Sequence, residues 1–351
     1  MAETVQLHMI LAIMIFQYCK RNESELNWTP HWLYALSFLH DLIAGHSLEN
    51  MQAIGLICLH MRNCEKPGAG WMMSGLALNL AVELGLHRSM SAWQPSAVEK
   101  DPRKIDLRKR VFYGILLLNT AFSRQLGRPV GIRLEDFDVE LPEPLDDYLP
   151  EEEATMTEWR KCSYRMGVHC FKWSVLSLQI ESLIYSVRTP SQPYEMTLRR
   201  LERDLDAWRE AIPPELQNGP QTRQEDRVFS LYLELGGSQL QLMLHHPSVC
   251  LTQNPEIVNR NLDICLEASS NLLHSAIHLR QLKSLGGTMQ DTVVFVAAIF
   301  TSIFAFTERK DQITSADLNN LKDGMEVWLD IMGEIGQSFG KLVSIWRFEP
   351  I

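Results

Sequence analysis

Several kinds of sequence pattern are missing from this chain of 351 residues, and each absence narrows the fold and the function. No Cys-x-x-Cys pair occurs, so the chain encodes no structural zinc site, and its seven scattered cysteines suit buried thiols in a reducing compartment. No basic residue precedes the apolar N-terminal run, which argues against a signal peptide. The most apolar stretch, 293–306, is too short to span a bilayer. We therefore expect a soluble intracellular protein that contacts no membrane.

A sustained alternation of apolar and polar residues is also missing, so we expect no significant sheet. Apolar residues instead recur at three- and four-residue intervals, which indicates helices. In one of them Asn254 and Pro255 suit the start, and Gly286-Gly287 the end. The sequence predicts an all-α fold, a large array of antiparallel helical hairpins with about ten to twelve helices. Besides 70–84 and the helix from Pro255, the expected helices cover 4–20, 30–44, 48–62, 104–126, 158–187, 195–211, 223–245, 289–308 and 315–335.

Basic residues are missing from Leu134 to Trp159, a stretch that contains eleven Asp and Glu residues. The formal net charge of the chain is −10, yet outside this stretch 32 acidic residues stand against 33 basic ones. Three prolines interrupt the stretch, so we interpret 134–157 as an acidic, solvated linker. It would join a helical half at 1–133 to a second half at 158–351, which we expect to pack on the first as one domain.

Four short patterns have a chemical interpretation, and each also has a simpler structural one. Residues 68–70 lack the third glycine and the preceding strand of a dinucleotide loop, and residues 45–47 lack the strand of a nucleophile elbow. The serine that ends 45–47 fits a helix N-cap. His274 and His278 have the spacing of metal ligands but no third partner, and 245–246 suits a helix end. We expect no catalytic residue, no metal and no cofactor.

Three closely spaced stretches differ from generic helix. The first, 70–88, places small residues on a helix and ends in Gly-Leu-His-Arg, where Gly85 suits a left-handed cap. The second, Arg-Lys-Arg-Val-Phe-Tyr at 108–113, opens an apolar helix. Leu-Gly-Arg-Pro at 126–129 ends that helix, and Asp-x-Asp-x-x-Leu-Pro at 136–142 follows.

In this order the motifs resemble the fungal-specific transcription factor domain, the regulatory region found downstream of the zinc binuclear cluster in fungal gene regulators. The motif residues, which we expect to have mainly structural roles, are Gly75, Ala77, Gly85, Leu86, His87, Arg88, Arg108, Arg110, Gly127, Arg128, Pro129, Asp136, Asp138 and Pro142. We expect Arg128, Asp136 and Asp138 to organise the turn after the second motif's helix through charge-assisted hydrogen bonds. Gly75 and Gly85 are expected to serve backbone packing.

The chain also departs from the family pattern. The six-cysteine cluster is missing, so we expect no direct sequence-specific DNA binding, and we interpret the chain as a fragment, a shortened product or a cluster-less relative. Asn119 stands where the family often has Asp, and His246 where it often has Arg.

The resemblance implies a nuclear regulatory domain that senses a small-molecule effector or binds transcriptional coregulators, with a homodimer as a further hypothesis. Fifteen Met and nine Trp residues favour an apolar, adaptable pocket between helices, although the sequence does not identify its residues. A basic cluster at 103–110 suits nuclear import or, more simply, the polar face of a helix. Two alternatives stay open: an enzyme for small molecules on a repurposed fold, and a ligand-free protein-interaction scaffold.

Overall fold

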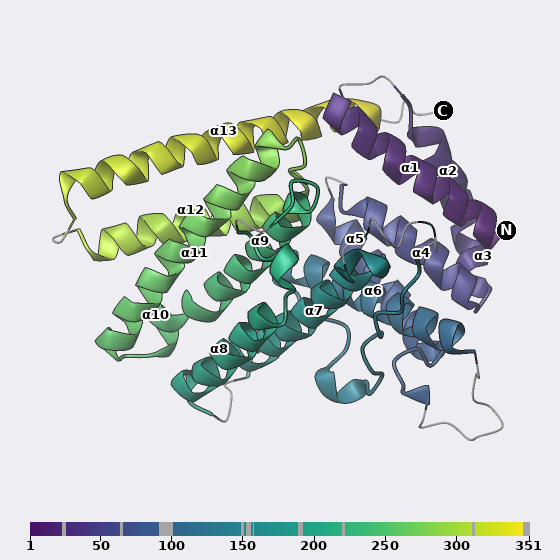
Figure 1. The fold of residues 1–351 in the computed structure, drawn as a ribbon, viewed down its shortest axis with the longest axis horizontal. Coiled ribbons are helices and arrows are strands. Elements are labelled where there is room, and N and C mark those ends of the chain that lie inside the picture. The colour runs from purple at the N-terminus through teal and green to yellow at the C-terminus, as the bar shows by residue number, and fades with distance from the viewer. Residues whose placement is uncertain are drawn as a thin grey trace. The chain divides into compact units, whose positions relative to one another are not determined.

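A computed structural model describes residues 1–22, 26–63, 66–90, 101–148, 151, 156, 158–188, 192–219, 222–310 and 313–346. The structure is 75% helical, and no strand occurs in these ranges (Figure 1). The predicted all-α fold is therefore confirmed.

The helices belong to two compact units, Met1–Leu178 and Gln179–Ile351. In the described chain, twelve α-helices have six residues or more, and α10 is a single turn. They are α1 (Ala2–Asn22), α2 (Thr29–Ser37), α3 (Leu39–Ala44), α4 (Leu48–Met61), α5 (Pro67–Glu83), α6 (Pro102–Leu126), α7 (Arg165–Ile184), α8 (Tyr194–Glu210), α9 (Arg227–His245), α10 (Ser248–Leu251), α11 (Pro255–Gln281), α12 (Met289–Glu308) and α13 (Ser315–Trp346). The boundary between the units falls within α7 and not in the acidic segment at 134–157. That the two halves pack as one domain stays a prediction.

Side-chain caps begin several helices where the sequence indicates them. Ser47 accepts a hydrogen bond from the backbone N–H of Asn50 at 3.2 Å, and Asn254 accepts one from Glu256 at 3.1 Å. Each bond satisfies one of the backbone donors that a helix start leaves without an intrahelical partner. The sequence alone thus places the first turns of α4 and α11.

Left-handed residues close three helix ends, one of them unexpectedly. Gly85 and Gly127 have φ angles of 66° and 59°, as predicted for glycine caps. The end predicted for α11 at Gly286-Gly287 is wrong, because the helix stops earlier, where Lys283 takes a φ of 50°. The N–H of Ser284 then turns back onto a carbonyl of the last turn at 2.8 Å.

Three other helix boundaries also differ from the expected ones. The segment 30–44 forms two helices, because Phe38 leaves the helical conformation with a φ of −102° and a ψ of 7°. The helix expected over 158–187 begins only after a 3-10 turn, and the last helix extends to Trp346. Apolar periodicity continues through all three places, so it cannot mark a one-residue break or a helix end.

A glycine allows α5 and α6 to approach closely in the first unit. A Cβ atom at Gly70 would lie 2.4 Å from a ring carbon of Phe122, so only glycine fits there. At Gly75, where the sequence suggested close packing, the nearest atom would be a side-chain nitrogen of Asn119 at 3.9 Å, an ordinary contact. The position that requires glycine is therefore Gly70.

We predict that Gly70→Ala destabilises the protein by about 1–3 kcal/mol, because the added methyl group overpacks the α5–α6 contact. Gly75→Ala in the same helix is the matched control, and it should leave stability unchanged or raise it by up to about 1 kcal/mol through better helix propensity. Urea unfolding measures both variants. Equal effects of the two substitutions would contradict the packing account.

His60 is buried in an aromatic cage in the first unit. Its ring lies 4.8 Å from Trp28, 4.9 Å from Trp32 and 5.6 Å from Phe16, measured between ring centroids. Neither ring nitrogen of His60 has a hydrogen-bond partner in the described structure. Burial therefore lowers the pKa of His60 from 6.5 to about 4, and the histidine is neutral in the folded protein at neutral pH.

This lowered pKa makes stability depend on pH. Between pH 6.5 and 4 the unfolded chain takes up a proton that the folded protein excludes, so the free energy of unfolding falls as the pH falls. We predict that His60→Leu removes roughly 2 kcal/mol of the loss between pH 6.5 and pH 5. Urea unfolding of the variant and the unsubstituted protein at both pH values measures this difference. Parallel pH profiles would show that His60 does not contribute.

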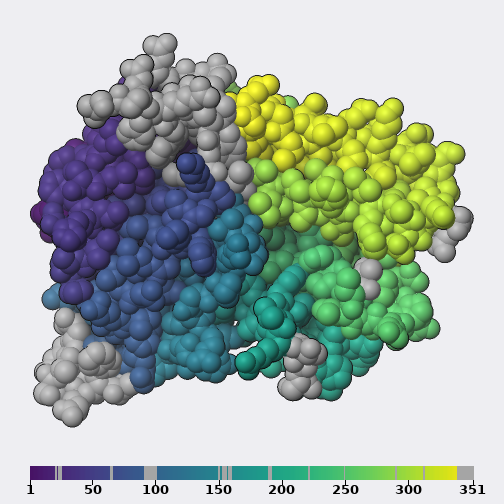
Figure 2. All heavy atoms as spheres, turned by 180° about the vertical axis from the view of Figure 1, so that it is seen from behind, coloured from purple at the N-terminus to yellow at the C-terminus, as the bar shows by residue number. Residues whose placement is uncertain are grey.

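The second unit is built around α9, α11, α12 and α13. Phe295 and Trp328 are buried in its core with ring centroids 4.9 Å apart. The outer side of α12 is apolar as well, since Phe300 is 67% exposed, and the last helices lie at the surface, yellow-green to yellow in Figure 2. The apolar stretch 293–306 lies within the longer α12, so it is not too short: by length and composition, α1 and α12 could both cross a membrane. The core helix of a soluble protein passes the same test.

Candidate functional site

Asp138 is the centre of the motif residues. Its carboxylate accepts two hydrogen bonds from the Arg88 guanidinium, at 3.0 and 3.3 Å, and one from the backbone N–H of Ser89 at 2.7 Å. These bonds, first those from Arg88, hold the pKa of Asp138 below its usual range. The backbone reinforces the contact, because the N–H groups of Asp138 and Val139 both donate to the His87 carbonyl.

A second carboxylate extends this contact to α6. Glu140 accepts a hydrogen bond from the Ser89 hydroxyl at 2.5 Å and pairs with the Lys109 ammonium at 3.4 Å. Arg108, one residue earlier on α6, donates to the carbonyls of Leu84 and Gly85 at the end of α5. A cation at the C-terminal end of a helix also interacts favourably with its dipole. The end of α5, the start of α6 and the turn at 138–140 therefore form one connected network.

The structure does not confirm the prediction that Arg128 helps to organise this turn. Arg128 is exposed, and its side chain makes no hydrogen bond or ion pair with any residue in the described ranges. Asp136 instead binds Arg133, whose guanidinium donates two hydrogen bonds at 3.1 Å. The two predicted carboxylates do organise the turn, but they do so with Arg133 and Arg88.

Asn119 fills its unusual position with two hydrogen bonds. Its side-chain N–H donates to the Ser74 hydroxyl at 3.1 Å, and its side-chain oxygen accepts from the backbone N–H of Gly131 at 3.1 Å. The amide thereby joins α5, α6 and the following turn, a double role that requires both a donor and an acceptor. An aspartate at this position could accept the second bond but could not donate the first.

The other motif residues also have structural positions. Arg110 pairs with the buried Asp106 at 2.5 Å and lies 3.5 Å above the ring of Tyr164. The Pro129 carbonyl accepts a hydrogen bond from Ser123 at 3.3 Å. Those with little solvent exposure are Ala77, Leu86 and Pro142. In the network at the end of α5, the start of α6 and the turn at 138–140, every charged side chain binds another group of the protein. This arrangement is typical of a structural contact between segments and not of a ligand-binding site.

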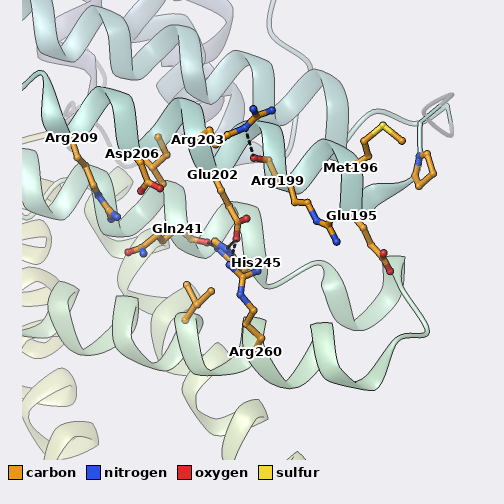
Figure 3. A pocket seen from close by; sticks show the side chains of 13 residues that line it. Glu195, Met196, Arg199, Glu202, Arg203, Asp206, Arg209, Gln241, His245 and Arg260 are labelled. Atoms are coloured by element: carbon orange, nitrogen blue, oxygen red, sulfur yellow. Dashed lines mark hydrogen bonds and ion pairs between the residues drawn. The ribbon is translucent and has the colours of Figure 1, made fainter.

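A groove of about 810 Å³ lies in the second unit between α8, α9 and α11 (Figure 3). Most of the side chains that line it are charged or polar. They are Glu195, Arg199, Glu202, Arg203, Asp206, Arg209, Gln241, His245 and Arg260, with Pro193, Met196, Leu205 and Ile264 as the apolar part. The volume is in the range of small-molecule sites, which are about 300–1,000 Å³.

Glu202 is the centre of this groove. One carboxylate oxygen accepts hydrogen bonds from the His245 ring and from the Arg260 guanidinium, both at 2.9 Å (Figure 3). Burial acts to raise the pKa of Glu202, but the bonds from His245 and Arg260 outweigh it, so the pKa lies below its usual value. This carboxylate therefore ties α8 to both α9 and α11.

The sequence reasoning did not assign a site to this groove. Along α8 acidic and basic residues are interspersed, a pattern that also fits an exposed helix face. His245 and His246 were predicted only as helix-end residues, and that role is confirmed, since their rings bond the Gln241 and Leu242 carbonyls at 2.7 and 2.8 Å. The remaining lining residues come from helices far apart in the chain.

The patterns weighed for other chemistry lie on ordinary helical structure. Residues 68–70 are in the first turns of α5, and the described residues before them, 26–63 and 66–67, contain no strand. The rings of His274 and His278 stack with centroids 4.9 Å apart, and no group of three or more metal-ligating side chains gathers in the described ranges.

Comparison with known proteins identifies the family of this chain. A family model described as "Fungal specific transcription factor domain" matches residues 6–210. The chain belongs to this family. The resemblance of its motifs is thereby confirmed, and all the motif residues and the whole of α8 lie within the matched part of the domain.

Several fungal transcription regulators are similar to this domain. "Activator of stress genes 1" of Saccharomyces cerevisiae is 26% identical over 312 residues, which is 86% of this chain and 31% of that protein. "Activator of stress genes protein 1" of Candida albicans is 24% identical over 60% of this chain and 24% of its own length. "Nitrogen assimilation transcription factor nirA" of Emericella nidulans is 22% identical over 66% of this chain and 27% of its length. No solved structure matches the chain.

We predict that Asp138→Asn lowers the melting temperature of this domain at pH 7, because it removes the negative charge that Arg88 and the Ser89 N–H bind. Glu135→Gln in the same turn is the matched control and should have a smaller effect. Since the folded pKa of Asp138 is lowered, its contribution is complete above the ordinary value of 3.8 and is lost as the pH falls through the folded pKa. Equal melting temperatures at pH 7 for the two variants would contradict this role.

Proposed function

We propose that this chain is the part of a fungal transcription factor that senses a small molecule and contacts coregulators in the nucleus. The family match over 6–210 carries the proposal, and relatives named as activators and transcription factors support it. The chain spans less than a third of the length of these relatives, so DNA recognition in such a protein can reside in regions outside the matched part.

The effector site that we propose is the groove between α8, α9 and α11. It differs from the apolar pocket expected from the Met and Trp content, because Met196 is its only Met and Trp208 and Trp328 are buried in the unit's packing. An apolar pocket stays a separate prediction. We infer a non-enzymatic role, since the named relatives regulate transcription. We also infer that this chain alone does not bind duplex DNA sequence-specifically.

The proposal predicts activity from a tethered chain. Residues 1–351 fused to an unrelated DNA-binding domain should change reporter expression several-fold, up or down, relative to that DNA-binding domain alone at equal protein abundance. Because Asp138→Asn loosens the network at the end of α5, a fusion that carries it should lose part of this change, and the Glu135→Gln fusion should keep it. A folded fusion that is abundant in the nucleus but leaves the reporter unchanged would refute the regulatory role.

A further inference from the structure

We infer that the groove between α8, α9 and α11 binds a small organic molecule through an oxyanion group, a carboxylate or a phosphate. The inference rests on the proposed function, which it deepens by naming the chemistry of the effector. It is carried by two features of the groove lining, the hydrogen bonds that engage Glu202 and the arginine side chains around it.

Both ring nitrogens of His245 face groups that can only accept hydrogen bonds. Nδ1 lies 2.7 Å from the Gln241 carbonyl oxygen, and Nε2 lies 2.9 Å from a carboxylate oxygen of Glu202. The side chain of His245 is 3% exposed, so water does not replace either partner. His245 is therefore held in place entirely by the protein, beside the Glu202 carboxylate.

The charged groups around His245 come from each of the packed helices. They are Glu202 on α8 and Arg260 on α11. Arg260 and the ring of His245, which belongs to α9, bond the same carboxylate oxygen of Glu202. Arg260 therefore compensates the charge of Glu202, which would otherwise repel a free carboxylate or phosphate in the groove.

Arg209 lies at the far end of α8 and is half-buried. Burial lowers its pKa, yet its side chain makes no hydrogen bond or ion pair in the described part of the chain, and Asp206, Glu234 and Glu267 act on it only at a distance. Gly237 makes room for the guanidinium, since a Cβ there would lie 3.3 Å from Nε. The Arg209 guanidinium can therefore bind an oxyanion in the groove through charge-assisted hydrogen bonds.

The rim of the groove has the same sign of charge. Arg199 and Arg203 are exposed one turn apart on α8, and the Nε atom of Arg203 donates to the Arg199 carbonyl at 3.3 Å (Figure 3). Among the other acidic residues of the lining, Glu195 accepts a hydrogen bond from the Thr252 hydroxyl at 3.0 Å. Four arginines stand against three acidic residues in the lining. A volume of about 810 Å³ suits a metabolite, and a polyanion such as DNA would require an extended basic face instead.

The test uses the full chain with two probes, inorganic phosphate and succinate, each against sodium chloride at the same ionic strength. Binding should raise the melting temperature and saturate with at least one probe, because a ligand of the folded state stabilises it by mass action. Saturation with phosphate alone identifies a phosphate ester as the effector class, and saturation with succinate alone identifies a carboxylic acid. No saturable rise with either probe overturns the inference.

Three variants localise the effect. Arg209→Gln should weaken the apparent affinity by at least about tenfold. Arg199→Gln should also weaken it, and because Arg199 is exposed, this substitution does not disturb the fold. Arg200→Gln on the same helix is the control, because Arg200 pairs with Asp204 and does not line the groove. Equal affinity of all three variants overturns the inference. If the tethered chain still changes reporter expression in that case, the regulatory function stands and only the ligand class fails.

Discussion

The three hydrogen bonds that end on the Asp138 carboxylate hold together the segments on which the first unit depends. They come from two consecutive residues, Arg88 and Ser89, at the end of α5, and they reach a position fifty residues later. Because the acceptor is charged, each bond is stronger than a neutral one. The same two helices, α5 and α6, also pack closely at Gly70, where a Cβ atom would lie 2.4 Å from a ring carbon of Phe122.

The acidic segment illustrates why net charge alone misleads. Eleven acids without a basic residue between them suggested a solvated linker, but Asp138, Glu140 and Asp147 each bind a particular donor, the last of them through Ser163. These three carboxylates are therefore bound by partners within the first unit. A pattern of like charges in sequence does not show where the opposite charges lie in space.

Signals within a few residues predicted most of the helices. Contacts between distant segments explain why the partner of Asp138 and the groove were not predicted. Ser47, Asn254 and Gly127 act within a few residues of their own position, so the sequence suffices to place them. The partner of Asp138 could not be predicted in this way, because a long arginine side chain reaches it from a distant segment while the neighbouring Arg128 points to solvent. The groove is further out of reach, since Glu202, His245 and Arg260 meet only after three helices have packed.

The end of α11 is also informative about how far selection has refined this chain. Lys283 holds a φ of 50°, a conformation that costs a residue with a β-carbon roughly 1 kcal/mol and costs glycine almost nothing. Two glycines stand only three and four residues later, at 286 and 287, where α11 has already ended. Natural proteins keep such unused stability because selection acts only until a threshold is met. The loop after α11 is therefore a natural starting point for an engineered, more thermostable form of the chain.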